Sequence, residues 1–102
     1  MPSEESLIQT DNVRVRVMPL LPGKATPWHF HTEVTDIMVC LNGVILVQLK
    51  QPEVQHELQP GQRCTVEVNR PHRVANANPN QPASYLLIQG VGRYDFNPLD
   101  FF

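Results

Sequence analysis

The sequence predicts an all-β fold of short strands, and three observations support this prediction. Apolar residues recur in short runs, several of which alternate with polar residues in the period-two pattern of strands. The 102-residue chain contains ten prolines and five glycines, a composition that favours many turns and few long helices. Turn signals return about every ten residues, a spacing typical of β-sandwiches and barrels.

Composition limits the class of protein further. The length fits one domain over residues 1–102, with a short arm over residues 1–10 and an aromatic tail over residues 92–102. The net charge of −2 offers no basic field for nucleic acid, and no apolar run has membrane-spanning length. The start MPSEESLIQT is acidic and polar, unlike a signal peptide. Cys40 and Cys64 are isolated, which favours two buried thiols over a disulfide, so we expect a cytoplasmic protein.

The first strand is predicted over Asp11–Leu20, where apolar and basic residues alternate. The face expected to be buried carries three valines: Val13, Val15 and Val17. The other face carries Arg14 and Arg16, which are expected to lie in solvent.

The next strand is predicted to begin at Pro27, where the missing N–H does little harm. Alternation places His29 and His31 together on one face of this strand. Trp28 and Phe30 then lie on the opposite face, where we expect them to pack under the N-terminal arm or a partner subunit.

The segment after this strand is apolar on both faces. One face carries Asp36, Met38 and Cys40, and the other carries Ile37, Val39 and Leu41. Asp36 follows His31 at an odd offset, so a turn or bulge at Thr32–Thr35 is required to bring it to the histidine side. The Asn42-Gly43 pair that follows predicts a hairpin into a strand over Val44–Lys50.

The same reasoning predicts strands in the rest of the chain. They are Val54–Leu58, Gln62–Val68, His72–Asn76 and Ser84–Gly90. Pro60-Gly61 and Asn69-Arg70-Pro71 are predicted turns, and Ala77–Pro82 is a predicted exposed loop.

His29 and His31 are the first candidates for chemistry. Two imidazoles at positions i and i+2 of a strand lie roughly 6.6 Å apart along one face, close enough to reach one metal ion. His72 and Asn76 end a second stretch that opens at Gly61.

These two stretches resemble the two sequence motifs of the cupin superfamily. The first motif runs Gly, five residues, His-x-His, three or four residues, Glu, six residues, Gly; it is matched by Gly23, His29, His31 and Gly43, with Asp36 in the Glu position. The second runs Gly, five residues, Pro-x-Gly, two residues, His, three residues, Asn; it is matched by Gly61, His72 and Asn76. Glu67 replaces the Pro and Asn69 the second Gly, and Asn tolerates a positive φ. The resemblance covers residues 23–76 and implies a small double-stranded β-helix, the jelly-roll barrel of cupins.

The resemblance also implies a ligand set for one divalent transition metal: His29, His31, Asp36 and His72. Fe, Mn, Ni and Zn all accept imidazole with a carboxylate. Asp is one methylene shorter than Glu, so Asp36 is either the fourth ligand or an acceptor for an imidazole N–H. Glu33 is a rival carboxylate and is expected to be a solvated turn residue.

Neighbouring residues suggest the walls of a cavity. Met38 and Cys40 are in phase with Asp36, and Val74 is in phase with His72, so these three residues are expected to line it. Arg63 and Arg73 could bind a carboxylate at its mouth, although solvation at the surface is the expected role for each.

Three functions remain open from the sequence. The first is a metal-dependent enzyme acting on a small organic molecule, as the resemblance to dioxygenase, isomerase, lyase and cyclase cupins implies. The second is a non-catalytic module that binds a small molecule or a metal, and the third is a metal-free structural barrel, which the three histidines disfavour. No residue besides the candidate ligands stands out as a general acid or base, so the reaction and substrate stay undefined.

The apolar faces also predict a homodimer. One small barrel has one interior, so it cannot cover both faces of the segment that carries Ile37 and Val39. A second copy could bury the outer face about a two-fold axis. The alternative is a monomer in which the aromatic tail, Tyr94–Phe102, covers part of that face.

Overall fold

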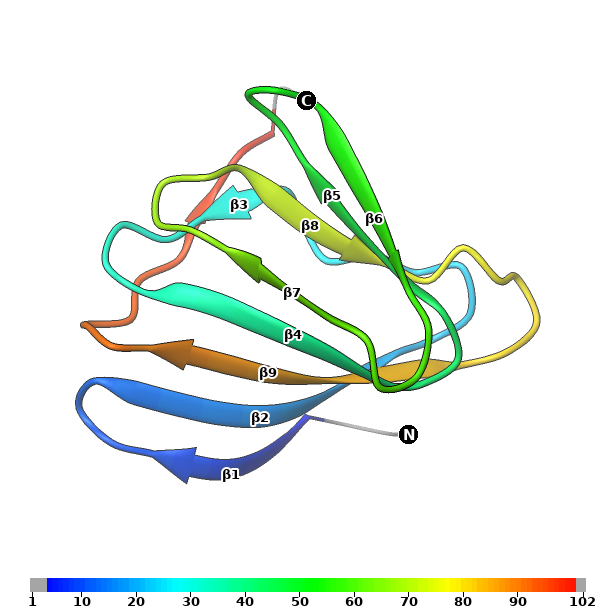
Figure 1. Ribbon diagram of the computed structural model, residues 1–102, viewed down its shortest axis with the longest axis horizontal. Helices are drawn as coiled ribbons and strands as arrows, with labels where there is room; N and C mark the ends of the chain where they lie inside the picture. Colours follow the sequence, from blue (N-terminus) through cyan, green and yellow to red (C-terminus); the bar gives the residue numbers. More distant parts are fainter. Residues whose placement is uncertain (1–3, 101–102) are drawn as a thin grey trace.

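The computed structural model describes residues 4–100, which form two five-stranded antiparallel sheets that face each other (Figure 1). The sheet with the longer strands has the order β1 (Glu5–Gln9), β2 (Val13–Leu20), β9 (Ala83–Gly90), β4 (Thr35–Asn42), β7 (Arg63–Val66). The sheet with the shorter strands has the order β10 (Asn97–Pro98), β3 (His29–Phe30), β8 (His72–Ala75), β5 (Ile45–Leu49), β6 (Val54–Leu58). We call them the long-strand and the short-strand sheet. The predicted all-β fold is confirmed.

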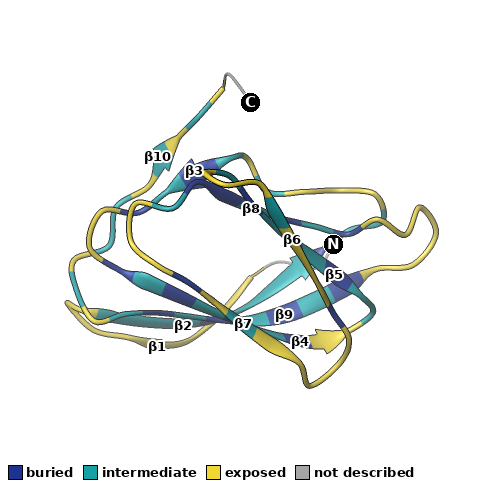
Figure 2. Cartoon of the chain, turned by 45° about the horizontal axis from the view of Figure 1, so that its top comes forward, coloured by how far each residue is buried: buried dark blue, intermediate teal, exposed yellow. Residues whose placement is uncertain are grey.

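The core lies between the sheets, and alternation decides which residues enter it. Along β9, and along β4 as far as Cys40, every second residue is buried and the residues between them are half-buried, whereas the last two residues of β4 are exposed (Figure 2). Both sheets contribute to the cluster of buried apolar residues, which includes Met38, Ile45, Val47, Val74 and Tyr85. The predicted inward face of β4 is therefore confirmed.

The turns that the motifs require are present. Gly23 and Gly61 have φ values of 70° and 88°, which a residue with a Cβ adopts only with strain. Asn69 has a φ of 64°, so it takes the left-handed conformation expected when it replaces a motif glycine. The chain bends between β3 and β4, as the odd offset of Asp36 requires.

The predicted hairpin at Asn42-Gly43 is wrong. β4 pairs with β7 and β9, whereas β5 pairs with β6 and β8, so this turn carries the chain from one sheet to the other. Gly43 is still required there. Its φ is 75°, and a Cβ would lie 2.9 Å from the Cβ of Ala83.

The prediction for the faces of β2 is also wrong. Arg16 is buried and lies on the inner side, whereas the valines of this strand are half-buried on the outer side. The guanidinium of Arg14 lies 3.8 Å from the ring centroid of Tyr94. Alternation identified the two faces correctly, but polarity alone assigned the wrong one to the interior.

Two other expectations concern the N-terminal arm and Trp28. Residues 5–9 of the N-terminal arm form β1, which pairs with β2. Trp28 packs beside two basic side chains, with Lys50 Nζ 5.3 Å and the Arg73 guanidinium carbon 5.1 Å from its ring centroid; its packing against a partner subunit stays a prediction. Cys40 and Cys64 are free thiols, the first buried and the second half-buried. Among residues 4–100 there is no helix that could cross a membrane.

Candidate metal centre

The four residues of the implied ligand set meet in space. His29 lies on β3, His31 directly follows it, Asp36 lies on β4 and His72 on β8. Each offers one ligand atom, these atoms lie within 4.8 Å of one another, and all four residues are buried. Antiparallel pairing of β3 with β8 sets His29 opposite His72, and β4 supplies Asp36 from the facing sheet.

Backbone carbonyls fix the orientation of all three imidazoles. The Nδ1 atom of His29 lies 2.6 Å from the carbonyl oxygen of Pro27, that of His31 lies 2.6 Å from Asp95 O, and that of His72 lies 2.8 Å from Arg70 O. In a neutral ring, Nδ1 then carries the proton that it donates to the carbonyl. The Nε2 lone pair is left to point into the cluster.

The arrangement around Asp36 fits a bound cation. Its Oδ2 atom lies 3.0 Å from Nε2 of His72 and 3.2 Å from Nε2 of His31. A lone pair facing a carboxylate at this distance is repulsive unless a proton or a metal ion lies between them. Ligand atoms about 2.1 Å from one ion, in tetrahedral or octahedral geometry, are about 3.0–3.4 Å from their neighbours. The donor set therefore fits a divalent transition metal.

Electrostatics in the cluster favour a negative Asp36 and a neutral His29. Burial alone would raise the pKa of Asp36, but the imidazoles of His31 and His72 beside its carboxylate lower this pKa well below its usual range. Burial and the neighbouring His72 lower the pKa of His29 to about 4. Burial would also lower the pKa of His31, but its hydrogen bond and charge interaction with Asp36 raise this pKa above its usual value.

A chain of hydrogen bonds holds the other oxygen of Asp36. The amide Nε2 of Gln89, on β9, donates to Asp36 Oδ1 at 3.1 Å. Arg16 Nη2, on β2, donates to Gln89 Oε1 at 2.8 Å, which fixes the direction of the amide. Arg16 Nη1 donates to the carboxylate of Glu4 at 3.1 Å. Asp36 is thus oriented from two sides.

A cavity of about 270 Å³ lies against this cluster. Its lining includes His29, His31 and Asp36 together with apolar residues from both sheets. Met38 and Val74 line it, whereas Cys40 lies apart in the packed core, with its Sγ 3.4 Å from Gly43 O.

The tail contributes to the same cavity. Tyr94 and Phe96 line it, and the ring of Phe96 stacks on that of His29 with centroids 4.5 Å apart. Asp95 accepts hydrogen bonds from Thr32 through its carboxylate, beside its carbonyl contact with His31. The described part of the tail therefore covers the candidate centre and not the outer face of the long-strand sheet.

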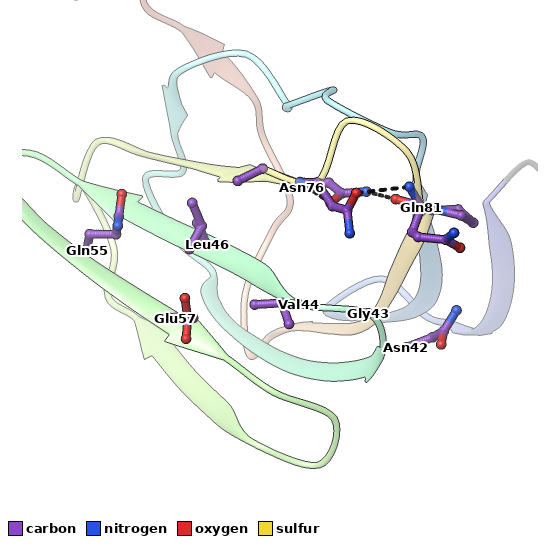
Figure 3. A pocket seen from close by; sticks show the side chains of 11 residues that line it. Asn42, Gly43, Val44, Leu46, Gln55, Glu57, Asn76 and Gln81 are labelled. Atoms are coloured by element: carbon purple, nitrogen blue, oxygen red, sulfur yellow. Dashed lines mark hydrogen bonds between the residues drawn. The ribbon is translucent and has the colours of Figure 1, made fainter.

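A larger hollow, of about 480 Å³, lies elsewhere and shares no lining residue with the cavity (Figure 3). Amide side chains and apolar residues of β5, β6 and the loop after β8 line it. Asn76, the last residue of the second motif, uses its side chain here to hold that loop, donating to Gln81 O at 2.8 Å. Glu57 is the one acidic or basic residue in its lining, so it has no counterpart of the histidine cluster.

Sequence reasoning missed several residues of the site. Gln89 and Arg16 are polar residues at inward positions of their strands. A polar residue in the alternating positions that face the interior was the signal that could have identified each of them. The arginines considered for the cavity mouth lie elsewhere: Arg63 is exposed, and Arg73 donates to Gln48. Glu33 is exposed and outside the cluster.

Comparison with known proteins agrees with the geometry. Residues 16–89 match the model of the cupin domain family. A double-stranded β-helix protein from Klebsiella pneumoniae has 18% identity and a TM-score of 0.79, over 91% of this chain and 75% of that one. A Thermus thermophilus protein has 25% identity and a TM-score of 0.75, over 87% and 82%. The polyketide cyclase RemF of Streptomyces resistomycificus has 20% identity and a TM-score of 0.80, over 97% and 71%. No curated protein matches the chain.

The fold and the family match define a class of protein. The chain belongs to the cupin family, because the family model covers most of its length. The double-stranded β-helix expected from the two motifs is confirmed by the two facing antiparallel sheets. The structural neighbours establish the fold and leave the reaction open.

Proposed function

We propose that this cupin binds one divalent transition metal through His29, His31, Asp36 and His72 and acts as an enzyme on a small organic molecule. The observation that carries the proposal is the convergence of three oriented imidazoles on one buried carboxylate, with all ligand atoms within 4.8 Å. Buried polar groups at this density are costly without a partner, and a cation would satisfy all four.

The cavity supports a catalytic role over a purely structural one. Four protein ligands would leave two positions open in an octahedral ion, and a space of about 270 Å³ adjoins the cluster that would hold it. This volume is at the small end of ligand pockets, which matches a small substrate. When bound, the metal would supply a Lewis acid that polarises an oxygen of the substrate or of water.

Within the site, the residues of the chain have separate tasks. His29, His31 and His72 would hold the ion through Nε2, because their Nδ1 atoms are engaged by carbonyls. Asp36 would offset its charge, and Gln89 keeps the carboxylate in place. Tyr94 and Phe96 are the tail residues that line this side of the cavity and would limit the access of water to it.

Metal content tests the proposal. Protein made without a histidine tag should contain about one equivalent of Fe, Mn, Ni or Zn by elemental analysis. His72→Ala should lose most of this metal while circular dichroism shows an unchanged fold. His56→Ala is the matched control, since His56 is exposed on β6 and outside the cluster. Equal metal content in the His72→Ala and wild-type proteins would exclude this ligand set, and a metal that supports no turnover of any small molecule would favour a non-catalytic binding module.

We also propose that two copies associate through the outer face of the long-strand sheet. Pairing aligns two apolar rows across β2, β9 and β4: Val15, Ile88 and Ile37 in one, and Val17, Leu86 and Val39 in the other. The described part of the tail lies at the cavity and leaves this face to a partner. A second copy of the chain, related to the first by a two-fold axis, would cover this face without the need for another protein. Two free thiols fit a reducing compartment, so we place the protein in the cytoplasm.

A further inference from the structure

Arg16 places a positive charge inside the cavity of the candidate centre. Its side chain is 9% exposed, and it lines the same cavity as His29, His31 and Asp36. One amide group and two hydrogen bonds link its guanidinium to Asp36, so the two charged groups lie within about 8 Å of each other. A small molecule in this cavity could contact both the guanidinium and the cluster.

The guanidinium is only partly satisfied. Its Nη2 donates to Gln89 and its Nη1 to Glu4, but its buried Nε has no hydrogen-bond partner among the described residues. A buried N–H without an acceptor is costly, and in a ligand site it indicates a missing acceptor. Nε and Nη2 form a fork that fits both oxygens of a carboxylate, because Nη2 has a second N–H beside the one it donates to Gln89.

Glu4 shows that the guanidinium of Arg16 already pairs with a carboxylate, through Nη1. Its carboxylate lies 3.1 Å from Arg16 Nη1, it also lines the cavity, and its side chain is 52% exposed. An ion pair with one exposed partner contributes little to stability, so a competing carboxylate can displace Glu4. The rest of the cavity wall is largely apolar, with Met18, Val74 and Leu87 among its residues.

We propose that the cavity binds a small organic carboxylate, with Arg16 holding the carboxylate group and the apolar wall holding the body, while Glu4 is a neighbouring carboxylate that competes for the same guanidinium. This inference builds on the proposed function, since it names the class of molecule that reaches the metal centre. Its test uses metal-free protein, so failure of the metal assignment and failure of the anion assignment are separate results.

The probe pair is benzoate and benzamide, which have nearly the same shape and differ in charge. Binding to protein stripped with a chelator is measured by calorimetry or by NMR titration, and repeated with Zn²⁺ added. Benzoate should bind wild-type protein more tightly than benzamide in both states. Arg16→Gln should weaken benzoate at least tenfold and leave benzamide unchanged, because only the charged ligand uses the fork.

Three variants complete the design. Glu4→Gln should tighten benzoate about threefold, because it removes a competing carboxylate from an exposed position. Arg16→Lys should weaken benzoate despite keeping the charge, because an ammonium lacks the fork. Arg63→Gln is the matched control: it makes the same charge change at an exposed residue outside the cavity, and should have no effect.

Several results would overturn the proposal. They are equal benzoate affinity in the wild-type and Arg16→Gln proteins, no preference for benzoate over benzamide, or weaker benzoate binding in Glu4→Gln. If Arg16→Gln does not fold, the Glu4→Gln result decides, because Glu4 is a surface residue. Benzoate binding that appears only with Zn²⁺ and persists in Arg16→Gln would assign the carboxylate to the metal and exclude the role of Arg16.

Discussion

Replacing Gln89 by Met tests whether the hydrogen-bond chain behind Asp36 controls the metal centre. Gln89 is 2% exposed, and it contacts two charged groups, donating to Asp36 and accepting from Arg16. Met has nearly the same length and can fill the same volume, but it provides neither bond. The substitution therefore removes the polar contacts with little change in packing.

The magnitude follows from these two bonds. A hydrogen bond to a charged group contributes about 1.5–3 kcal/mol, and both groups left behind are buried. Gln89→Met should therefore lower the free energy of unfolding by about 3 kcal/mol or more. Replacing a residue that orients a metal ligand typically lowers metal affinity by about 10- to 100-fold, so we expect Gln89→Met to lose Zn²⁺ affinity by this factor.

The assay is a competition titration of Zn²⁺ against a chelating dye at pH 7.5, with urea unfolding of the metal-free protein alongside. Gln48→Met is the matched control, because Gln48 also accepts from an arginine, Arg73, and donates to an amide, that of Gln55. Gln55 is exposed and Arg73 only half-buried, and neither contacts the cluster, so the control should change stability less than Gln89→Met and leave Zn²⁺ affinity unchanged. A Zn²⁺ affinity of Gln89→Met within twofold of wild type would show that Asp36 needs no support from Gln89, or that Asp36 is not a ligand.

Four further predictions follow from the same structure. Metal affinity should fall as pH drops from 8 to 5, because Asp36 raises the pKa of His31 and protons then compete with the metal for this imidazole. A metal affinity that does not change between pH 8 and pH 5 would contradict this prediction. Metal-free protein should also lose stability as pH falls from 6.5 towards 4, because His29 stays neutral when folded, with a pKa of about 4, but binds a proton when unfolded. Gly43→Ala should destabilise the protein by about 1–3 kcal/mol more than Gly23→Ala in urea unfolding, because both have positive φ but only Gly43 meets atoms of Ala83 at 2.9 Å; equal losses would refute the clash. Val39→Lys should shift the mass measured by light scattering from a dimer towards the 11.6 kDa of one chain with metal content unchanged, and a wild-type mass of one chain would exclude the dimer.

The sequence alone determined the framework of the site. Spacing placed His29, His31 and His72 on the two cupin motifs, and motif glycines with Asn69 at positive φ form the turns that bring these strands together. The strand period fixed which residues share a face, so the need for a bend before Asp36 could be predicted without coordinates. Local backbone geometry is encoded locally, which is why these predictions succeeded.

Tertiary structure decided what local patterns leave open. The Asn42-Gly43 turn has the composition of a hairpin, but the pairing of β5 with β6 and β8 makes it a crossing between sheets. Phase in the sequence grouped Cys40 with Met38, yet the barrel places Cys40 in the packed core and Met38 at the cavity.

The two faces of β2 show the physical reason most clearly. Alternation separates valines from arginines, but it does not say which set faces the interior, because a barrel with a polar site inside reverses the usual rule. Arg16 enters the cavity because Gln89 and Glu4, 73 and 12 positions away in the chain, accept its hydrogen bonds. Such partners come together only when the sheets close, so the direction of Arg16, and with it the charge of the cavity, is a property of the folded barrel.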